Sequence, residues 1–238
     1  MHPPRHPQLR HGRPIKGLWC VLLFYGITAI GYGWLNPVFE APDEPSHVAN
    51  ANLMLREHRW PSRAEIEATA QFLETHTDPS VDYEVFNACQ WNIFLLWPHP
   101  PLYSLLQTIP LGLVYPGGYD GTLIPVRPDY RDRRERGYFQ YRPPDPRDLS
   151  RPTLAVRLMR MVSVGLGALV VWVTAHLARV VAPWSSSLPV LAAGLLAFIP
   201  QFTFMSASVN NDVLGYLASA VALWVMVRIV QDPGPPWQ

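Results

Sequence analysis

Four long apolar runs divide the chain, and the first of them is the clearest. Residues 17–36 contain no charged side chain, and an α-helix of about twenty residues rises about 30 Å, the thickness of a bilayer's hydrocarbon core. A cleaved signal peptide is the competing interpretation, but the run is long for such a segment and no small-x-small cleavage site follows it. The pattern therefore favours an uncleaved first transmembrane helix.

Three further spans are predicted within residues 153–230. The first, residues 157–181, has basic side chains near both ends and an apolar middle. Residues 188–209 are uncharged, and Pro200 inside this run predicts a kink. Residues 213–230 form the last span, which ends at an arginine that can reach the membrane surface.

A long and mostly polar segment, residues 37–152, separates the first two spans. Helical spacing of its apolar side chains predicts helices over residues 44–57 and 63–74. Residues 91–115 are uncharged but contain four prolines, which disfavour a straight span. We therefore expect a juxtamembrane helix over residues 100–115, and a fifth span over residues 91–115 stays open as the alternative.

The predicted fold is thus an all-α membrane protein of about four transmembrane helices with a long extracytoplasmic first loop. Residues 1–16 form a basic tail, and the chain has no acidic residue before Glu40. The positive-inside rule places this tail in the cytoplasm. Four spans then return the second tail, residues 231–238, to the same side.

The composition argues against nucleic-acid binding and against paired cysteines, and it indicates no particular partner. The chain is 49 % hydrophobic and only 16 % charged, with a net charge of +1, so nothing indicates nucleic-acid binding. Cys20 lies in an apolar run and Cys89 in a polar loop. We expect them at different depths, which argues against a disulfide or a cysteine metal site.

The main candidate chemistry follows the first span, where residues 40–47 read EAPDEPSH. Asp43 is a natural N-cap for a helix with Pro45 in its first turn, which is the purely structural interpretation. The two adjacent carboxylates, Asp43 and Glu44, lie where the first span should give way to water, and this position makes them the catalytic candidates. A divalent metal held by Asp43, Glu44 and His47 is a further alternative, although adjacent residues at one helix start chelate poorly.

Other polar residues fall on the same predicted side of the membrane. Arg157 and Arg160 begin the second span, and their structural interpretation is that they snorkel to the interface. Asp212 precedes the last span, and its structural interpretation is that it caps the helix with help from Asn210 and Asn211. The substrate-binding candidates are His47, His99, Arg157, Arg160, Asn211 and Asp212.

Four motifs together resemble the integral-membrane C-type glycosyltransferases, and in particular a bacterial branch with a P-D-E-P-x-H element in the first loop. Residues 42–47 match that element, and residues 99–103, HPPLY, resemble the x-P-P-L-Y juxtamembrane helix. Residues 157–163, RLMRMVS, are similar to the R-L-x-S start of the next span. Residues 200–212, PQFTFMSASVNND, are similar to the second outer loop.

The resemblance implies transfer of a sugar from a polyprenyl-phosphate donor to an extracytoplasmic acceptor at a bacterial plasma membrane. It implies that Asp43, with Glu44, acts as general base or positions the acceptor, and that Arg157 or Arg160 offsets the donor's phosphate charge. Asp212 would assist the acceptor or a metal. Such enzymes have more spans than this chain, so we expect either a truncated product or a split enzyme in which a second membrane polypeptide supplies the missing spans.

A non-catalytic membrane subunit is the alternative function. It would bind a polysaccharide or a partner protein through residues 37–152. A transporter is less favoured because the predicted spans contain no charge in mid-membrane.

Overall fold

The computed structural model describes residues 14–39, 41, 43–65, 67, 100–120, 123 and 147–231. Within these residues every regular element is a helix, so the predicted all-α class is confirmed there. The helices are α1 (Leu18–Leu35), α2 (Glu44–Glu57), α5 (Leu102–Val114), α6 (Arg151–Val181), α7 (Leu188–Ala197), α8 (Pro200–Ser206) and α9 (Asp212–Gln231).

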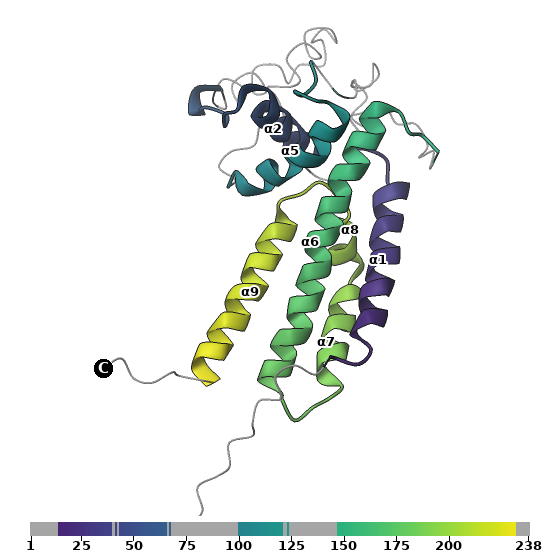
Figure 1. The fold of residues 1–238 in the computed structure, drawn as a ribbon, viewed down its shortest axis with the longest axis vertical. Helices are drawn as coiled ribbons and strands as arrows, with labels where there is room; N and C mark the ends of the chain where they lie inside the picture. Colours follow the sequence, from purple (N-terminus) through teal and green to yellow (C-terminus); the bar gives the residue numbers. More distant parts are fainter. Residues whose placement is uncertain are drawn as a thin grey trace, which may run out of the picture.

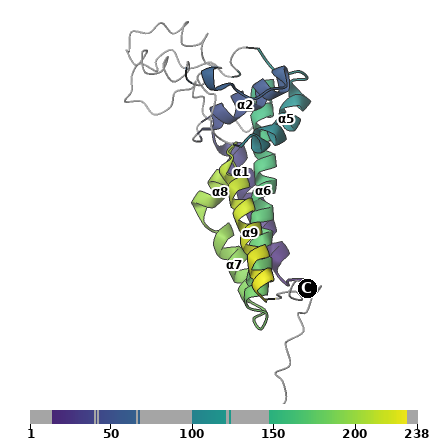
Figure 2. The ribbon, with the colours of Figure 1, turned by 90° about the vertical axis from the view of Figure 1, so that its left-hand side faces the viewer.

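The helices form an elongated bundle with a small helical layer across one end. α1, α6, α7 and α9 run side by side, and α2 and α5 lie at the end where α6 and α9 begin (Figure 1). The view from the side shows the same arrangement (Figure 2). α1 and α7 begin, and α6 and α9 end, at the opposite end of the bundle, so successive helices of the bundle alternate in direction.

Several of these helices are long and apolar enough to cross a membrane. α1, α6 and α9 qualify by themselves, and α7 with α8 makes a fourth candidate if the bent pair is one span. α5 has 13 residues and rises only about 20 Å, which is too short to cross a hydrocarbon core.

α6 begins earlier than the sequence predicted. We expected a span from residue 157, but the helix starts at Arg151 and has 31 residues. Asp148 supports this start, because its carboxylate accepts hydrogen bonds from the Ser150 N–H and the Thr153 hydroxyl at 2.9 and 2.7 Å. At 31 residues α6 rises about 46 Å, so it is longer than the hydrocarbon core of a bilayer is thick.

The third predicted span is bent by 69° between α7 and α8. α8 begins at Pro200, where the kink was predicted, because proline has no N–H and forces the preceding residue out of the helical conformation. Ile199 is accordingly extended. The Thr203 hydroxyl donates to the Ala197 carbonyl at 3.1 Å, which satisfies a carbonyl group that the break leaves without its helical partner.

The helices predicted in the polar segment agree in part with the structure. α2 has the predicted bounds, 44–57, and α5 lies within the predicted range 100–115. Residues 63–65 and 67 are helical, while the rest of the predicted helix 63–74 and residues 91–99 lie outside the described residues.

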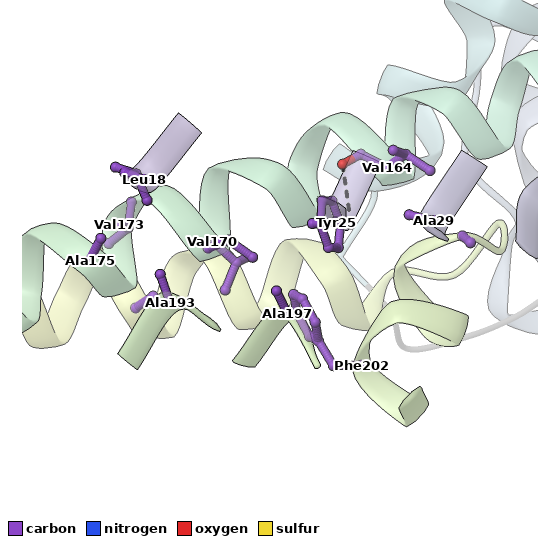
Figure 3. Packing of buried hydrophobic residues seen from close by; sticks show 13 residues of the cluster. Leu18, Tyr25, Ala29, Val164, Val170, Val173, Ala175, Ala193, Ala197 and Phe202 are labelled. Carbon is purple, nitrogen blue, oxygen red and sulfur yellow. Dashed lines mark hydrogen bonds between the residues drawn. The ribbon is translucent and has the colours of Figure 1, made fainter. Parts of the chain in front are cut away.

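Small side chains allow the bundle helices to approach closely. The Tyr25 hydroxyl of α1 donates to the Val164 carbonyl of α6 at 3.3 Å, in the middle of the apolar cluster (Figure 3). A Cβ atom added at Gly167 would lie 2.0 Å from the Tyr25 hydroxyl oxygen and 2.8 Å from the Ser206 Cβ. Gly167 is therefore required where α1, α6 and α8 meet.

Replacing Gly167 by alanine should destabilise the bundle by about 1–3 kcal/mol, because the added methyl group overpacks a filled site. Gly165→Ala is the matched control on the same helix, since a Cβ there has nothing within 4 Å. Thermal unfolding in detergent measures both variants. Equal unfolding temperatures for the two would contradict this packing.

Candidate functional site

A buried ion pair between α2 and α6 forms the centre of the polar end of the bundle. Glu44 is the first residue of α2, and Arg160 lies in the third turn of α6. Their side chains are 0 % and 1 % exposed. The Arg160 Nε and Nη2 atoms donate to the two Glu44 oxygens at 2.8 and 2.7 Å, the bidentate geometry in which an arginine binds a carboxylate most strongly.

The Glu44 carboxylate also accepts two backbone N–H groups. The Val209 N–H donates to Oε1 at 3.0 Å, and the Phe39 N–H donates to Oε2 at 2.8 Å. Each oxygen therefore accepts two hydrogen bonds, which is the full capacity of a carboxylate. An acidic side chain in the first turn also interacts favourably with the dipole of α2.

Arg160 uses all five of its N–H groups. Besides the two bonds to Glu44, Nη1 donates to the carbonyls of Gly33 and Asn36 at 2.9 and 2.8 Å, and Nη2 donates to the carbonyl of Pro37 at 2.8 Å. These carbonyls lie in the last turn of α1 and just after it, where helical partners are lacking and a positive charge is favoured. Arg160 thus caps α1 while it binds α2.

Two residues beside this pair have left-handed backbone conformations. Phe39 has φ 69° and Asp43 has φ 60°, a region that costs about 1–2 kcal/mol for most L-residues and less for Asp or Asn. Asp43 holds the N-cap position of α2, but its side chain makes no capping hydrogen bond. The predicted capping role is therefore wrong. The Asp43 side chain is exposed instead, directly beside the buried Glu44.

His47 links α2 to the segment before α9. Its ring is buried, and Nε2 accepts the Asn211 N–H at 3.4 Å. Nε2 is therefore unprotonated in this arrangement. The ring also packs edge-on against Tyr103 of α5, with ring centroids 5.5 Å apart.

A second buried polar group joins α5 to α6. The Tyr103 hydroxyl lies 2.7 Å from the Ser163 Oγ, and the Gln107 amide nitrogen lies 3.5 Å from the same oxygen. Burial raises the pKa of the Tyr103 hydroxyl well above its ordinary value, and hydrogen bonds with Ser163, Gln107 and the Asn210 backbone lower it by less. Tyr103 is thus protonated at neutral pH and serves as a hydrogen-bonding group.

Arg157 is also turned into the protein, so neither arginine snorkels. The Arg157 side chain is buried, with Nη1 donating to the Asp148 carbonyl and Nη2 to the Trp34 carbonyl at 3.5 Å. Its guanidinium carbon lies 4.4 Å from the centroid of the Trp34 ring, a cation–π contact.

The last candidates lie at the start of α9. The Asp212 N–H, at the first position of α9, donates to the Asn210 Oδ1 at 2.8 Å, which is the help in capping that was expected from Asn210. The Asp212 side chain is exposed and Asn211 is half-buried. His99 lies outside the described residues.

The structure therefore unites most of the candidates at one end of the bundle. Glu44 contacts Arg160 and the segment before α9, His47 contacts Asn211, and Asp43 and Asp212 are the exposed neighbours of these contacts. In the part of the chain that the structure describes, no three His, Cys, Asp or Glu side chains are grouped to hold a metal ion. Ser163 was noted only as the last residue of the motif at residues 157–163, and Gln107 was missed, because neutral polar residues inside apolar helices give little signal in the sequence.

The helices define the class of this chain: an α-helical protein with several candidate membrane spans, which indicates a multi-pass membrane protein. Comparisons with protein-family models, with curated proteins and with solved structures found no match.

Replacing Glu44 by glutamine should cost about 3–5 kcal/mol of stability, because Arg160 is then left as an uncompensated buried charge. The matched control is Glu67→Gln, which breaks an exposed ion pair with Arg63 and should change stability little. Denaturant unfolding in detergent measures both. If Glu44→Gln and Glu67→Gln unfold alike, the buried pair does not organise this end of the bundle.

Proposed function

We propose that this chain is a membrane glycosyltransferase, or the N-terminal portion of one. It transfers a sugar from a polyprenyl-phosphate donor to an acceptor outside the cytoplasm. The observation that supports this proposal best is the buried Glu44–Arg160 pair, which fixes the exposed Asp43 at the end of the bundle where Asn211 and Asp212 also lie. The order of the four motifs that resemble C-type glycosyltransferases points to the same residues.

Asp43 is the proposed general base or acceptor-positioning carboxylate. It is exposed, its side chain does not cap α2, and its backbone is held in a strained conformation. Strained residues held by their surroundings are concentrated at functional sites. A carboxylate within reach of an acceptor hydroxyl can withdraw its proton as the new bond to the sugar forms.

Glu44 and Arg160 take positioning roles in this proposal. The resemblance implies that Glu44 assists catalysis and that Arg160 meets the donor phosphate. All the donors of Arg160 and all the lone-pair positions of Glu44 are occupied within the protein, so neither group has capacity left for a substrate. Within this proposal the acceptor is then bound by the exposed Asp43 and Asp212 and the half-buried Asn211.

The same proposal places the polar end outside the cytoplasm of a bacterial cell. Lys16, Arg179 and Arg228 lie near the opposite end of the bundle, before α1 and near the ends of α6 and α9. Basic residues next to spans favour the cytoplasmic side.

A non-catalytic membrane subunit is the second candidate. The observation that favours it is again that every hydrogen-bonding position of Glu44 and Arg160 is used within the protein, as expected for an ion pair with a purely structural role. In that case the polar segment binds a polysaccharide or a partner protein, and Asp43 has no chemical role.

Replacing Asp43 by asparagine should lower turnover of polyprenyl-phosphate-linked sugars by at least about 100-fold in membranes, the usual loss for a general base. Unfolding should not change, because Asn is similar in size and also tolerates a left-handed backbone. Glu67→Gln, which removes an exposed acid paired with Arg63, is the control and should keep full turnover. Full turnover by Asp43→Asn would remove the catalytic role.

Replacing Asp43 by glycine separates the two candidate functions. Glycine adopts the left-handed conformation without a steric penalty, so the free energy of unfolding should stay within about 1 kcal/mol of the original. A glycosyltransferase should lose its turnover. A non-catalytic subunit, in which Asp43 only shapes the backbone, should still bind its polysaccharide or partner protein. That result would favour the second candidate.

A further inference from the structure

We propose that His47 is a positioning residue, which holds Asn211 and Asp212 at a fixed distance from α2 and from the Asp43 at its N-cap. The inference rests on the proposed function for the role of these residues, since Asp43, Asn211 and Asp212 bind the acceptor there. The contacts of His47 are a property of the fold, and they are measured without turnover.

The first argument is that His47 is bonded to both segments that carry the proposed acceptor site. Its backbone N–H donates to the Asp43 carbonyl at 3.1 Å, and its Nε2 accepts the Asn211 N–H at 3.4 Å. One residue therefore connects the exposed acid before α2 with the segment before α9. His47 is only 2 % exposed, so it acts on the acceptor site through these bonds and not by touching the acceptor.

The second argument is that side chains hold the whole segment before α9. Residues 209–211 directly precede this helix, and bonds within a helix do not reach their N–H groups. The backbone of each residue instead bonds a side chain of α2 or α5: Val209 bonds Glu44, Asn210 bonds Tyr103, and Asn211 bonds His47. His47 thus holds the residue of this segment that is next to Asp212.

The position of Asn211 also sets the start of α9. The Asn211 carbonyl accepts the N–H groups of Leu214 and Gly215, in the first turn of α9, at 3.0 and 3.2 Å. Asp212 lies between the residue that His47 holds and the first bonds of the helix. A displacement of Asn211 away from α2 would therefore move Asp212 as well.

The third argument is that the His47 ring is itself held in place. It packs edge-on against Tyr103, with ring centroids 5.5 Å apart and planes at 77°, and the Tyr103 hydroxyl lies 2.7 Å from the Ser163 Oγ of α6. Functional groups keep a productive geometry when the residues that support them are fixed by packing and further hydrogen bonds. The His47 ring meets that condition.

Two substitutions separate the acceptor atom of His47 from the rest of its ring. His47→Phe keeps an aromatic ring against Tyr103 but has no acceptor for the Asn211 N–H. His47→Gln has no ring, but its side-chain oxygen can accept that hydrogen bond. His176→Phe is the matched control, because His176 lies in the last two turns of α6, at the opposite end of the bundle (Figure 1).

Distances between two spin labels measure the geometry on the full chain in lipid nanodiscs. In a background with Cys20→Ser and Cys89→Ser, labels are attached at Glu57→Cys, the last residue of α2, and at Asp212→Cys, the first residue of α9. Pulsed electron–electron double resonance then gives the distribution of distances between the labels in each variant.

We expect the same narrow distribution with the original His47, with His47→Gln and with His176→Phe. His47→Phe should give a distribution at least about twice as wide, because the Asn211 N–H has lost its acceptor. An unchanged distribution in His47→Phe would overturn the proposal. Equal broadening in His47→Gln would overturn it as well, because the acceptor atom would then not be what matters. His47→Leu, which also lacks an acceptor, replaces His47→Phe if that variant does not fold.

Turnover of polyprenyl-phosphate-linked sugars in membranes tests the role of this geometry separately, in chains without labels. His47→Phe should lower turnover at least about ten-fold, and His47→Gln should keep it within about three-fold of the original, since small displacements of bound groups slow a reaction strongly. Full turnover in His47→Phe would remove the positioning role. No turnover in the original chain would contradict the proposed function and leave the distance result unaffected.

Discussion

The polar end of this protein depends on one buried ion pair whose hydrogen bonds are complete. Glu44 and Arg160 are 116 residues apart in the sequence, and between them they bind the end of α1, the start of α2, the third turn of α6 and the segment before α9. Buried charges are costly to desolvate and add little net stability, but a fully bonded pair admits only one arrangement of its partners. The pair therefore specifies geometry more than it stabilises the fold.

That geometry divides the acidic motif into a buried and an exposed carboxylate. Because Glu44 points inward and draws the Phe39 and Val209 N–H groups to itself, Asp43 is held outside with a left-handed backbone. His47, one turn further along α2, accepts the Asn211 N–H and packs against Tyr103. The exposed acid, the segment before α9 and α5 are thus connected through α2.

The sequence predicted the helices better than the roles of the side chains. Hydrophobic period, length and the position of a proline are local properties, so they predicted α1, the bounds of α2 and the break before Pro200. They did not predict the early start of α6, whose first turns are polar enough to resemble a loop. Which of Asp43 and Glu44 is buried depends on a contact with Arg160 more than a hundred residues away, and no local pattern contains that information. The same holds for the pairing of Tyr103 with Ser163.

The central claim is that Arg160 and Glu44 are bonded directly and shielded from water. Proton-detected NMR of the protein in lipid bilayers hydrated with deuterated water tests it most directly. We expect an arginine Nε–H resonance that persists after the exposed Arg59 and Arg63 signals have exchanged and that shows a short-range contact with a glutamate carboxyl carbon. Exchange of every arginine Nε–H signal within minutes, or the absence of that contact from every persistent signal, would contradict the claim.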